Sequence, residues 1–212
     1  MIKINEVVEQ IVYSEEEALY SLSQKFMNLS AYAKRIRKEV ERQTKKTVKT
    51  TSIVVALSRI QKQMKKVHPL IQDIKINNIT AKSPLSEIVF EKTPATITKY
   101  SQLYEKVKTT SDDFLTITLS TSEITIICSD RIKQSILNHF KEIPIMIEAG
   151  LASLGISIDP KYYPMPNITY SLIRRIATKK IPLAETITTH AEIIFVFHQE
   201  NLSEVLNLFQ TQ

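Results

Sequence analysis

An internal repeat restricts the fold of this sequence more than any other feature. Residues 122–127 (SEITII) resemble residues 191–196 (AEIIFV), and residues 136–140 (ILNHF) resemble residues 205–209 (VLNLF). Both pairs lie 69 residues apart (122 to 191, 136 to 205), so the two blocks keep their spacing. A duplication of this kind indicates two copies of one supersecondary unit.

Each copy shows the same order of expected elements. A strand with buried alternation precedes the first repeated block, and the second block lies on a short amphipathic helix. The unit is therefore β-α-β-β-α, and residues 144–150 can add a final strand to the first copy. Helices on one face of an antiparallel sheet give an α+β sandwich. The upstream elements are strand-like runs around 88–90 and 156–158, helices at 98–107 and 169–177, and strands at 114–119 and 183–189.

The positive charge of the chain is concentrated in one segment. Residues 25–66 carry 13 Lys and Arg against Glu39 and Glu41, a net charge of +11, although the whole chain has a net charge of only +6. A localised basic region is the electrostatic footprint expected of a nucleic-acid-binding face. A solvated helix surface in a lysine-rich proteome would carry the same charge.

Three helices are expected in this N-terminal part, at 4–26, 31–44 and from the capping cluster at 50–52 to about Val67, before His68-Pro69. The short polar break at 45–49 makes the last two resemble a helix-turn-helix, in which the helix after the turn enters the major groove. The residues expected to face outward on that helix are Thr51, Ser52, Val55, Arg59, Lys62 and Gln63. Those expected to contact phosphates are Lys34, Arg35, Lys45, Lys46 and Lys49.

Two alternatives stay open for this region. A three-helix segment that serves dimerisation would show the same pattern. The period changes to two at Ile74, Ile76 and Ile79, which fits either the wing of a winged helix or the first strand of the next domain. We place the winged helix-turn-helix-like domain at residues 1–84.

The second copy resembles an ACT domain of the aspartokinase type. The likeness rests on residues 156–159 (ISID), 166–170 (PNITY) and 181–185 (IPLAE), and on hairpins of the pattern T/S-x-E, at residues 120–123 and 189–192. It implies two ferredoxin-like βαββαβ ACT repeats, at 85–150 and 151–212. The second repeat lacks its last strand. Residues 74–80 or a partner chain would have to fill that position, because an open edge is a liability.

The resemblance also implies a ligand site and a dimer. ACT domains bind small ligands, often amino acids, between two copies, where a helix N-terminus favours a carboxylate. The family's turn glycine is Asn167 here, and Asn tolerates a left-handed backbone. The alternative is a turn that binds nothing. The ligand residues carried over are Pro166, Asn167, Ile168 and Thr169 in the turn and Glu185, Thr186 and Thr188 on the facing strand.

The sequence lacks the motifs of several classes of enzyme and metal-binding protein. With only two glycines, Gly150 and Gly155, it has no glycine-rich phosphate loop. Its four histidines show no metal-ligand spacing, and no nucleophile–base pair can be assigned. We therefore expect no catalytic residue, metal or cofactor. The single Cys128 is expected to be a buried thiol, and the absence of a signal peptide or membrane span predicts a cytoplasmic address.

The two halves together predict a non-catalytic regulatory protein. A basic helix-turn-helix joined to ACT repeats would be an amino-acid-responsive transcriptional regulator, homodimeric through its ACT domains. The alternative is an ACT protein that controls a metabolic enzyme by direct contact, without DNA. A catalytic function has little support.

Overall fold

The structure is a computed structural model that describes residues 3–64, 70–162, 164–190 and 192–210. Contacts divide the chain into unit 1 (Met1–Asp73) and unit 2 (Ile74–Gln212), which are described separately. None of the helices in the described ranges combines the length and the apolar character that a membrane crossing requires.

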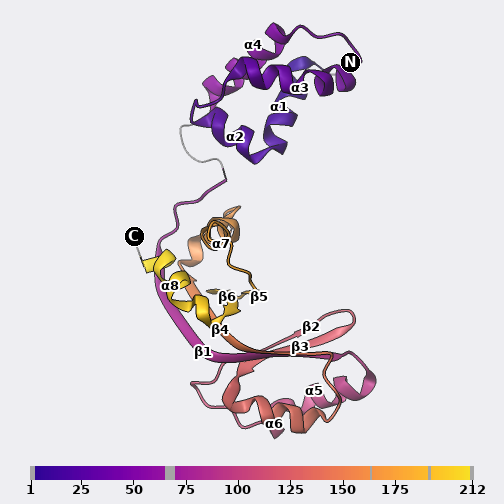
Figure 1. The fold of residues 1–212 in the computed structure, drawn as a ribbon, viewed down its shortest axis with the longest axis vertical. Helices are drawn as coiled ribbons and strands as arrows, with labels where there is room; N and C mark the ends of the chain where they lie inside the picture. The colour runs from indigo at the N-terminus through magenta and orange to yellow at the C-terminus, as the bar shows by residue number, and fades with distance from the viewer. Residues whose placement is uncertain (1–2, 65–69, 163, 191, 211–212) are drawn as a thin grey trace. The chain divides into compact units, whose positions relative to one another are not determined.

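Unit 1 consists of helices packed around one apolar core (Figure 1). Each helix buries residues three or four positions apart, which is the spacing of one helix face. The central contacts are those of α4 with α1 and α3. The described helices are α1 (Ile4–Ser14), α2 (Glu16–Ser23), α3 (Leu29–Thr44) and α4 (Thr50–Gln63).

The single helix predicted at 4–26 is wrong, because the chain breaks between α1 and α2. Glu15 has an extended backbone (φ −117°, ψ 111°). Its carboxylate accepts a hydrogen bond from the Tyr32 hydroxyl at 3.1 Å and forms an ion pair with Arg35. Burial and this hydrogen bond raise the pKa of Tyr32 to about 12. The break turns α2, so that Leu19 and Leu22 enter the same core as α1.

α3 and α4 are consecutive helices that pack on each other across the short turn between them. The Asn28 side chain caps α3 by accepting a hydrogen bond from the Ala31 N–H at 3.0 Å. Lys45 ends α3 in the left-handed conformation. α4 ends at Gln63, where Met64 is extended, and the predicted end near Val67 lies outside the described residues.

Unit 2 is one six-stranded antiparallel sheet in the order β2-β3-β1-β4-β6-β5. Short 3₁₀ turns at Pro160–Tyr162 and Gln199–Asn201 join some of its elements. The strands are β1 (Ile76–Glu91), β2 (Leu115–Leu119), β3 (Glu123–Ser129), β4 (Met146–Ile158), β5 (Glu185–Thr188) and β6 (Glu192–His198). The helices are α5 (Pro94–Lys106), α6 (Asp130–Phe140), α7 (Ile168–Ala177) and α8 (Leu202–Gln210).

The two repeats share their two longest strands. The second half of β1 pairs with β3, whereas its first half pairs only with β4 among the described strands. In the same way, the first residues of β4 pair only with β1 among the described strands, whereas β4 also pairs with β6 from Leu151 onward. Each long strand is thus the first strand of one repeat and the last strand of the other. The position left open in the second repeat is filled by the start of β1, close to the predicted segment 74–80.

The shared strands β1 and β4 run across the expected boundaries at 84 and 150. β1 runs continuously across residue 84, so the segment considered as a wing is part of the sheet of unit 2. The register of β1 against β4 shifts around the cis Ser83-Pro84 bond and again opposite Gly150, which has φ +73°. Bulges are the positions in a sheet where proline and left-handed glycine fit.

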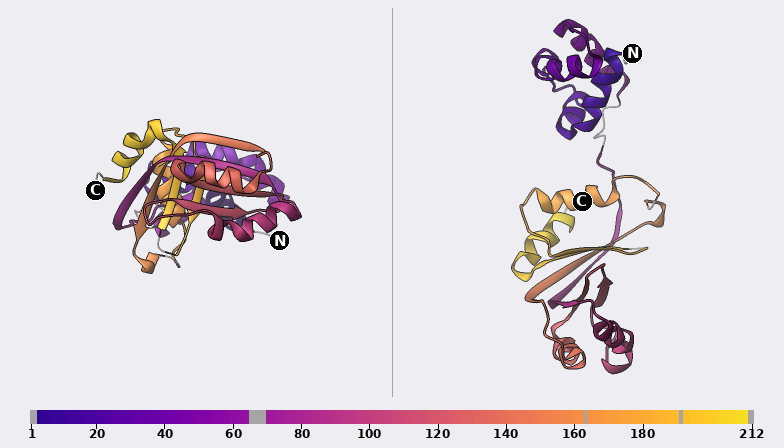
Figure 2. Two further views of the ribbon diagram at one scale, coloured as in Figure 1. Left: turned by 90° about the horizontal axis from the view of Figure 1, so that it is seen from below. Right: turned by 90° about the vertical axis from the view of Figure 1, so that its right-hand side faces the viewer.

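The helices of the two repeats cover separate cores, with α5 and α6 at one end of the sheet and α7 and α8 at the other (Figures 1 and 2). α5 and α6 cover a core that includes stacked Phe90 and Phe140, with ring centroids 4.3 Å apart. α7 and α8 cover a second core, in which Phe195 stacks on Phe209 at 6.3 Å. The repeated sequence blocks therefore supply equivalent core positions, Phe140 and Phe209.

The sheet face turned away from these helices is called the inner face. It carries a smaller apolar cluster, formed by Leu85, Ile127, Leu151, Ile194 and Val196. Side chains alternate along a strand, and Ile88 and Phe90 of β1 face the helices. The inner-face residues of β1 in this region are therefore Leu85, Glu87 and Val89.

Candidate functional site

A pocket of about 230 Å³ opens at the start of α7. We call it the α7 pocket. Asn167, directly before the helix, has a left-handed backbone (φ 66°, ψ 17°), and its side chain does not cap α7. The first backbone N–H groups of a helix have no partner within it, and the helix dipole makes this end attractive to anions. The lining residues are Ile158, Met165, Asn167, Ile168, Thr169, Tyr170, Thr188 and Ile193.

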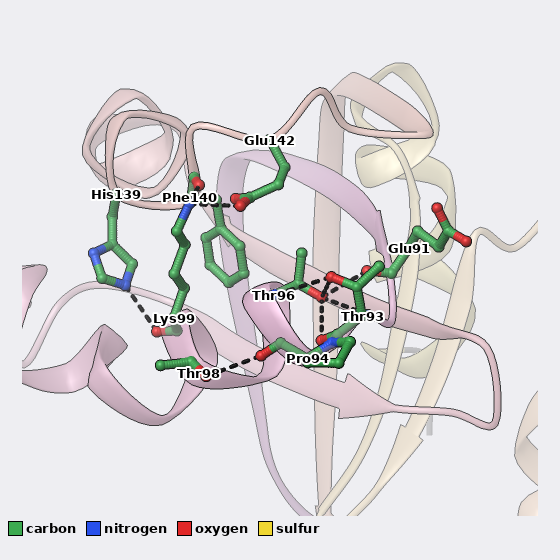
Figure 3. A network of polar contacts seen from close by, with 9 residues as sticks. All are labelled: Glu91, Thr93, Pro94, Thr96, Thr98, Lys99, His139, Phe140 and Glu142. Atoms are coloured by element: carbon green, nitrogen blue, oxygen red, sulfur yellow. Dashed lines mark hydrogen bonds and ion pairs between the residues drawn. The ribbon is translucent and has the colours of Figure 1, made fainter.

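The first repeat closes the equivalent helix start with its own side chains (Figure 3). The Thr93 hydroxyl accepts a hydrogen bond from the Thr96 N–H at 3.2 Å, and the Thr93 N–H donates to the Thr96 hydroxyl at 2.8 Å. The Thr96 hydroxyl also donates to the carbonyl of Glu91 at 2.7 Å. Pro94, the first residue of α5, has no N–H to offer. The start of α5 in the first repeat is therefore closed by its own side chains, whereas the start of α7 in the second repeat opens into a pocket.

A second part of the same network fixes α5 to the end of α6. The Lys99 ammonium donates to the Phe140 carbonyl and to the Glu142 carboxylate, at 2.6 Å for the latter. His139 donates from Nε2 to the Lys99 carbonyl at 2.7 Å. The Lys99 contact holds the pKa of Glu142 below its usual value. This network satisfies the Phe140 carbonyl at the end of α6 and links it to the middle of α5, and we assign it a structural role.

The structure brings together four of the seven residues predicted for the ligand site. Asn167, Ile168, Thr169 and Thr188 line the α7 pocket. Pro166 is exposed in the turn and Thr186 is exposed on β5, and neither lines the pocket. Met165, Tyr170 and the strand residues Ile158 and Ile193 were not predicted. Met165 and Tyr170 directly adjoin the predicted turn, so a wider window around it would have included them.

Glu185, the remaining predicted ligand residue, lies on the inner face instead. It alternates with Thr188 along β5, so the two side chains point to opposite sides of the sheet. There its carboxylate contributes to the environment of Glu87, which is 6% exposed. Burial, then the carboxylate of Glu185 and then that of Glu148, raise the pKa of Glu87 to about 7. Sequence reasoning missed Glu87, because an acid at a buried strand position leaves no distinctive pattern.

The predicted DNA-contacting residues form the exposed side of α4 and the turn before it. Thr51, Ser52, Arg59 and Lys62 are exposed on α4, and Val55 between them is 50% exposed. Because these positions are three or four residues apart, they lie along one helix face. Lys45, Lys46 and Lys49 are exposed in the turn, and Lys34 is exposed on α3.

Arg35 differs from the other predicted cations. It forms an ion pair with Glu15 and lies 4.7 Å above the Tyr32 ring, so it braces α2 against α3. Arg37 and Arg42 are likewise paired with Glu41 and Glu39. In the part of the chain that the structure describes, no ion pair engages Lys34, Lys45, Lys46, Lys49, Arg59 or Lys62.

Other site chemistry is limited in the described ranges. No group of three or more His, Cys, Asp or Glu there could hold a metal ion. Cys128 is buried, as predicted, and burial raises the pKa of its thiol to about 12, so it is a poor nucleophile.

Similarity to known proteins is found in structure but not in sequence. No protein-family model matches the sequence, and neither does any curated protein. The aspartate kinase of Clostridium acetobutylicum, an allosteric enzyme, matches 66% of this chain with a TM-score of 0.52 and 13% identity. This chain spans only 35% of that enzyme.

The regulatory subunit of aspartate kinase from Thermus thermophilus, in its ligand-free form, matches 65% of this chain with a TM-score of 0.51 and 8% identity. In this case 96% of the other chain is covered. The antiparallel α+β sheet of unit 2 therefore has the fold of an aspartate kinase regulatory subunit. This agrees with the fold that the ACT resemblance implies.

Proposed function

We propose that this chain is a non-catalytic regulatory protein that binds a small carboxylate ligand in the α7 pocket and DNA through unit 1. The observation that carries the ligand half is the difference between the two repeats. α5 begins with a closed cap of threonines, whereas α7 begins at a left-handed Asn167 without a side-chain cap and opens into a pocket.

The lining of the α7 pocket indicates the class of ligand. Its polar side chains are those of Asn167, Thr169, Tyr170 and Thr188, and its apolar side chains are those of Ile158, Met165, Ile168 and Ile193. A carboxylate at the helix start and an apolar side chain against Ile158 and Ile193 would suit this surface. An apolar amino acid meets both requirements. In a homodimer through the ACT repeats, the partner copy would complete the site.

Titration calorimetry of the full chain with each of the twenty amino acids tests this half. We expect binding of one or a few apolar amino acids. Thr188→Val should weaken it about tenfold by removing a hydroxyl from the pocket. Thr186→Val is the matched control on the same strand and should bind like the unchanged chain. Binding that is lost equally in both variants, or absent for all twenty, would refute the site.

The DNA half rests on cations of unit 1 that form no ion pair with any residue the structure describes. Lys45, Lys46 and Lys49 in the turn and Arg59 and Lys62 on α4 surround an exposed face that also carries Val55. Such a face suits phosphate contacts at its rim and base contacts at its centre. A ligand bound in dimeric ACT repeats would then bias the spacing of two α4 helices.

A gel-shift assay on genomic DNA fragments at low salt tests this half, since phosphate contacts are strongest there. Arg59→Ala with Lys62→Ala should weaken binding at least tenfold. Lys106→Ala with Lys108→Ala, which removes the same charge from exposed positions of unit 2, should not. Equal losses from both pairs would indicate nonspecific charge only, and no shift at low salt would end the proposal.

One observation favours the alternative of contact with an enzyme. A pocket of about 420 Å³ between α2 and α3 is lined by Ala18, Met27 and Tyr32 and by Phe26, which is 75% exposed. Exposed aromatic residues beside a pocket are common at protein interfaces. If DNA binding fails, we expect a partner protein from lysate to be captured by the chain and lost with Phe26→Ala.

A further inference from the structure

The start of β4 is an open edge of the sheet in unit 2. β4 pairs with β1 from Met146 onward, and the N–H of Ile145 just before it donates to the carbonyl of Val89 at 2.7 Å. β6 joins the other side of β4 only from Leu151. Among the described strands, none pairs with that side before this point. We call residues 143–149 the β4 edge.

The β4 edge exposes large apolar side chains one after another. Ile143 is 92% exposed, Ile145 58%, Met146 39% and Ile147 45%. No charged residue lies within positions 143–147. An exposed edge strand of this kind pairs readily with a strand of another chain, and proteins usually protect such edges with charged residues or cover them.

The second repeat has an equivalent edge with a different surface. The start of β1 completes the second repeat as the start of β4 completes the first, and it pairs only with β4 among the described strands. Its exposed residues are small or polar, namely Asn77, Asn78, Thr80 and Ala81. The apolar surface of the β4 edge is therefore not a general property of this fold.

The charged residues that flank the β4 edge are engaged within the chain. The Lys99 ammonium pairs with Glu142 at 2.6 Å (Figure 3), and His198 Nε2 lies 3.1 Å from Glu148 Oε1. The edge between these two carboxylates matches a strand that is itself uncharged and apolar. The same segment of a second copy has this composition, and a two-fold axis makes such a contact self-complementary.

We propose that two copies of this chain join through their β4 edges, which pair antiparallel around a two-fold axis at Met146 and make one continuous sheet. In this register Ile145 of each copy lies opposite Ile147 of the other, and Glu148 lies opposite Pro144. The β4 edge belongs to the first repeat, so this interface is separate from the α7 pocket of the second repeat and does not rest on it.

The neighbouring registers are less favourable. An axis at Ile145 would place Glu142 directly opposite Glu148, and like charges in directly opposite positions destabilise a pair of strands. An axis at Ile147 would extend the pairing to Leu151, which β6 already occupies. The axis at Met146 avoids both conflicts and keeps the isoleucines in contact.

Analytical ultracentrifugation of the full chain over a range of concentrations tests the association. We expect a dimer, and Ile145→Lys should weaken it at least tenfold by placing a charge at the centre of the paired edges. Asn78→Lys adds the same charge at the equivalent edge of the second repeat and should associate like the unchanged chain. Both positions are exposed, and thermal unfolding followed by circular dichroism checks that both variants fold.

A cysteine cross-link tests the register. Met146→Cys places two thiols opposite each other at the axis, so mild oxidation should give disulfide-linked dimers. Leu119→Cys is the control on the edge strand β2, because Leu119 is 40% exposed and Met146 39%, and it should cross-link at least tenfold more slowly. The proposal is overturned if the unchanged chain stays monomeric, which would assign the edge to a strand of another protein. It is also overturned if Ile145→Lys and Asn78→Lys associate equally, or if the two cysteine variants cross-link at the same rate.

Discussion

Gly155, one of only two glycines in the chain, offers a sharp test of the packing between strands β1, β4 and β6. A Cβ added at this position would lie 1.9 Å from Glu192 Oε1 and 2.6 Å from Thr80 Oγ1. These two side chains meet above the glycine, where the Thr80 hydroxyl donates to Glu192 at 2.9 Å. Gly155→Ala must therefore separate them, because both distances are far below van der Waals contact.

The expected cost of Gly155→Ala combines three contributions. Loss of the Thr80–Glu192 hydrogen bond costs about 0.5–1.5 kcal/mol. The Glu192 carboxylate is the far end of a flexible side chain and can rotate away cheaply, whereas Thr80 Oγ1 must shift from its rotamer at a cost of about 0.5–1.5 kcal/mol. Alanine restricts the unfolded chain and returns about 0.4–1 kcal/mol. We therefore expect a net destabilisation of about 1 kcal/mol, within a range of roughly 0–2.5 kcal/mol.

A double-mutant cycle separates this reasoning from a general intolerance of alanine in β4. In a Thr80→Ala, Glu192→Ala background the obstructing atoms are absent, so Gly155→Ala should be neutral or stabilising by about 0.4–1 kcal/mol. Hydrogen exchange of β4 peptides measures each step, with peptides of unit 1 as the internal reference. If Gly155→Ala costs the same in both backgrounds, the close approach is not the reason for the glycine.

Three further predictions address other positions and can be checked by thermal and urea unfolding of the full chain. Asn167→Ala should destabilise unit 2 by about 1–2 kcal/mol because of its left-handed backbone, whereas Asn167→Gly should be tolerated; equal losses would contradict the φ-based explanation. Phe140→Ala should cost about 3–5 kcal/mol by removing the stack on Phe90, and a loss under 1 kcal/mol would contradict its role in the core. Lys99→Met should cost about 1–3 kcal/mol, because it leaves the Phe140 carbonyl and Glu142 without their donor; Lys106→Met, at the exposed end of α5, is the control and should be silent.

The repeat made much of unit 2 predictable. Its two hairpins close as the T/S-x-E pattern indicates, since the N–H groups of Ser120 and Thr189 donate to the carbonyls of Glu123 and Glu192. The paired core positions Phe140 and Phe209 also follow from the aligned blocks. These features depend on local turn chemistry and on alternation within one strand, which a sequence displays directly.

Features that depend on distant partners were not predictable in the same way. The break at Glu15 interrupts an unbroken helical pattern, and it depends on contacts with Tyr32 and Arg35 on another helix. Ser83-Pro84 resembles the end of a strand, yet β1 continues through it as a bulge because β4 supplies pairing on both sides. The place of Glu185 on the inner face depends on the pairing of β5 with β6, which no single segment encodes alone.

The shared strands also set the order in which unit 2 can assemble. The start of β1 precedes the first repeat in the chain but completes the sheet of the second repeat. Its pairing with the end of β4 therefore requires that the whole first repeat, which lies between them in sequence, has been synthesised. Pairing between segments so far apart in sequence is slow, because a long loop must close before any contact forms. The two repeats are therefore not independent units. If either repeat were deleted, exchanged or produced alone, the remaining repeat would lack one of its strands.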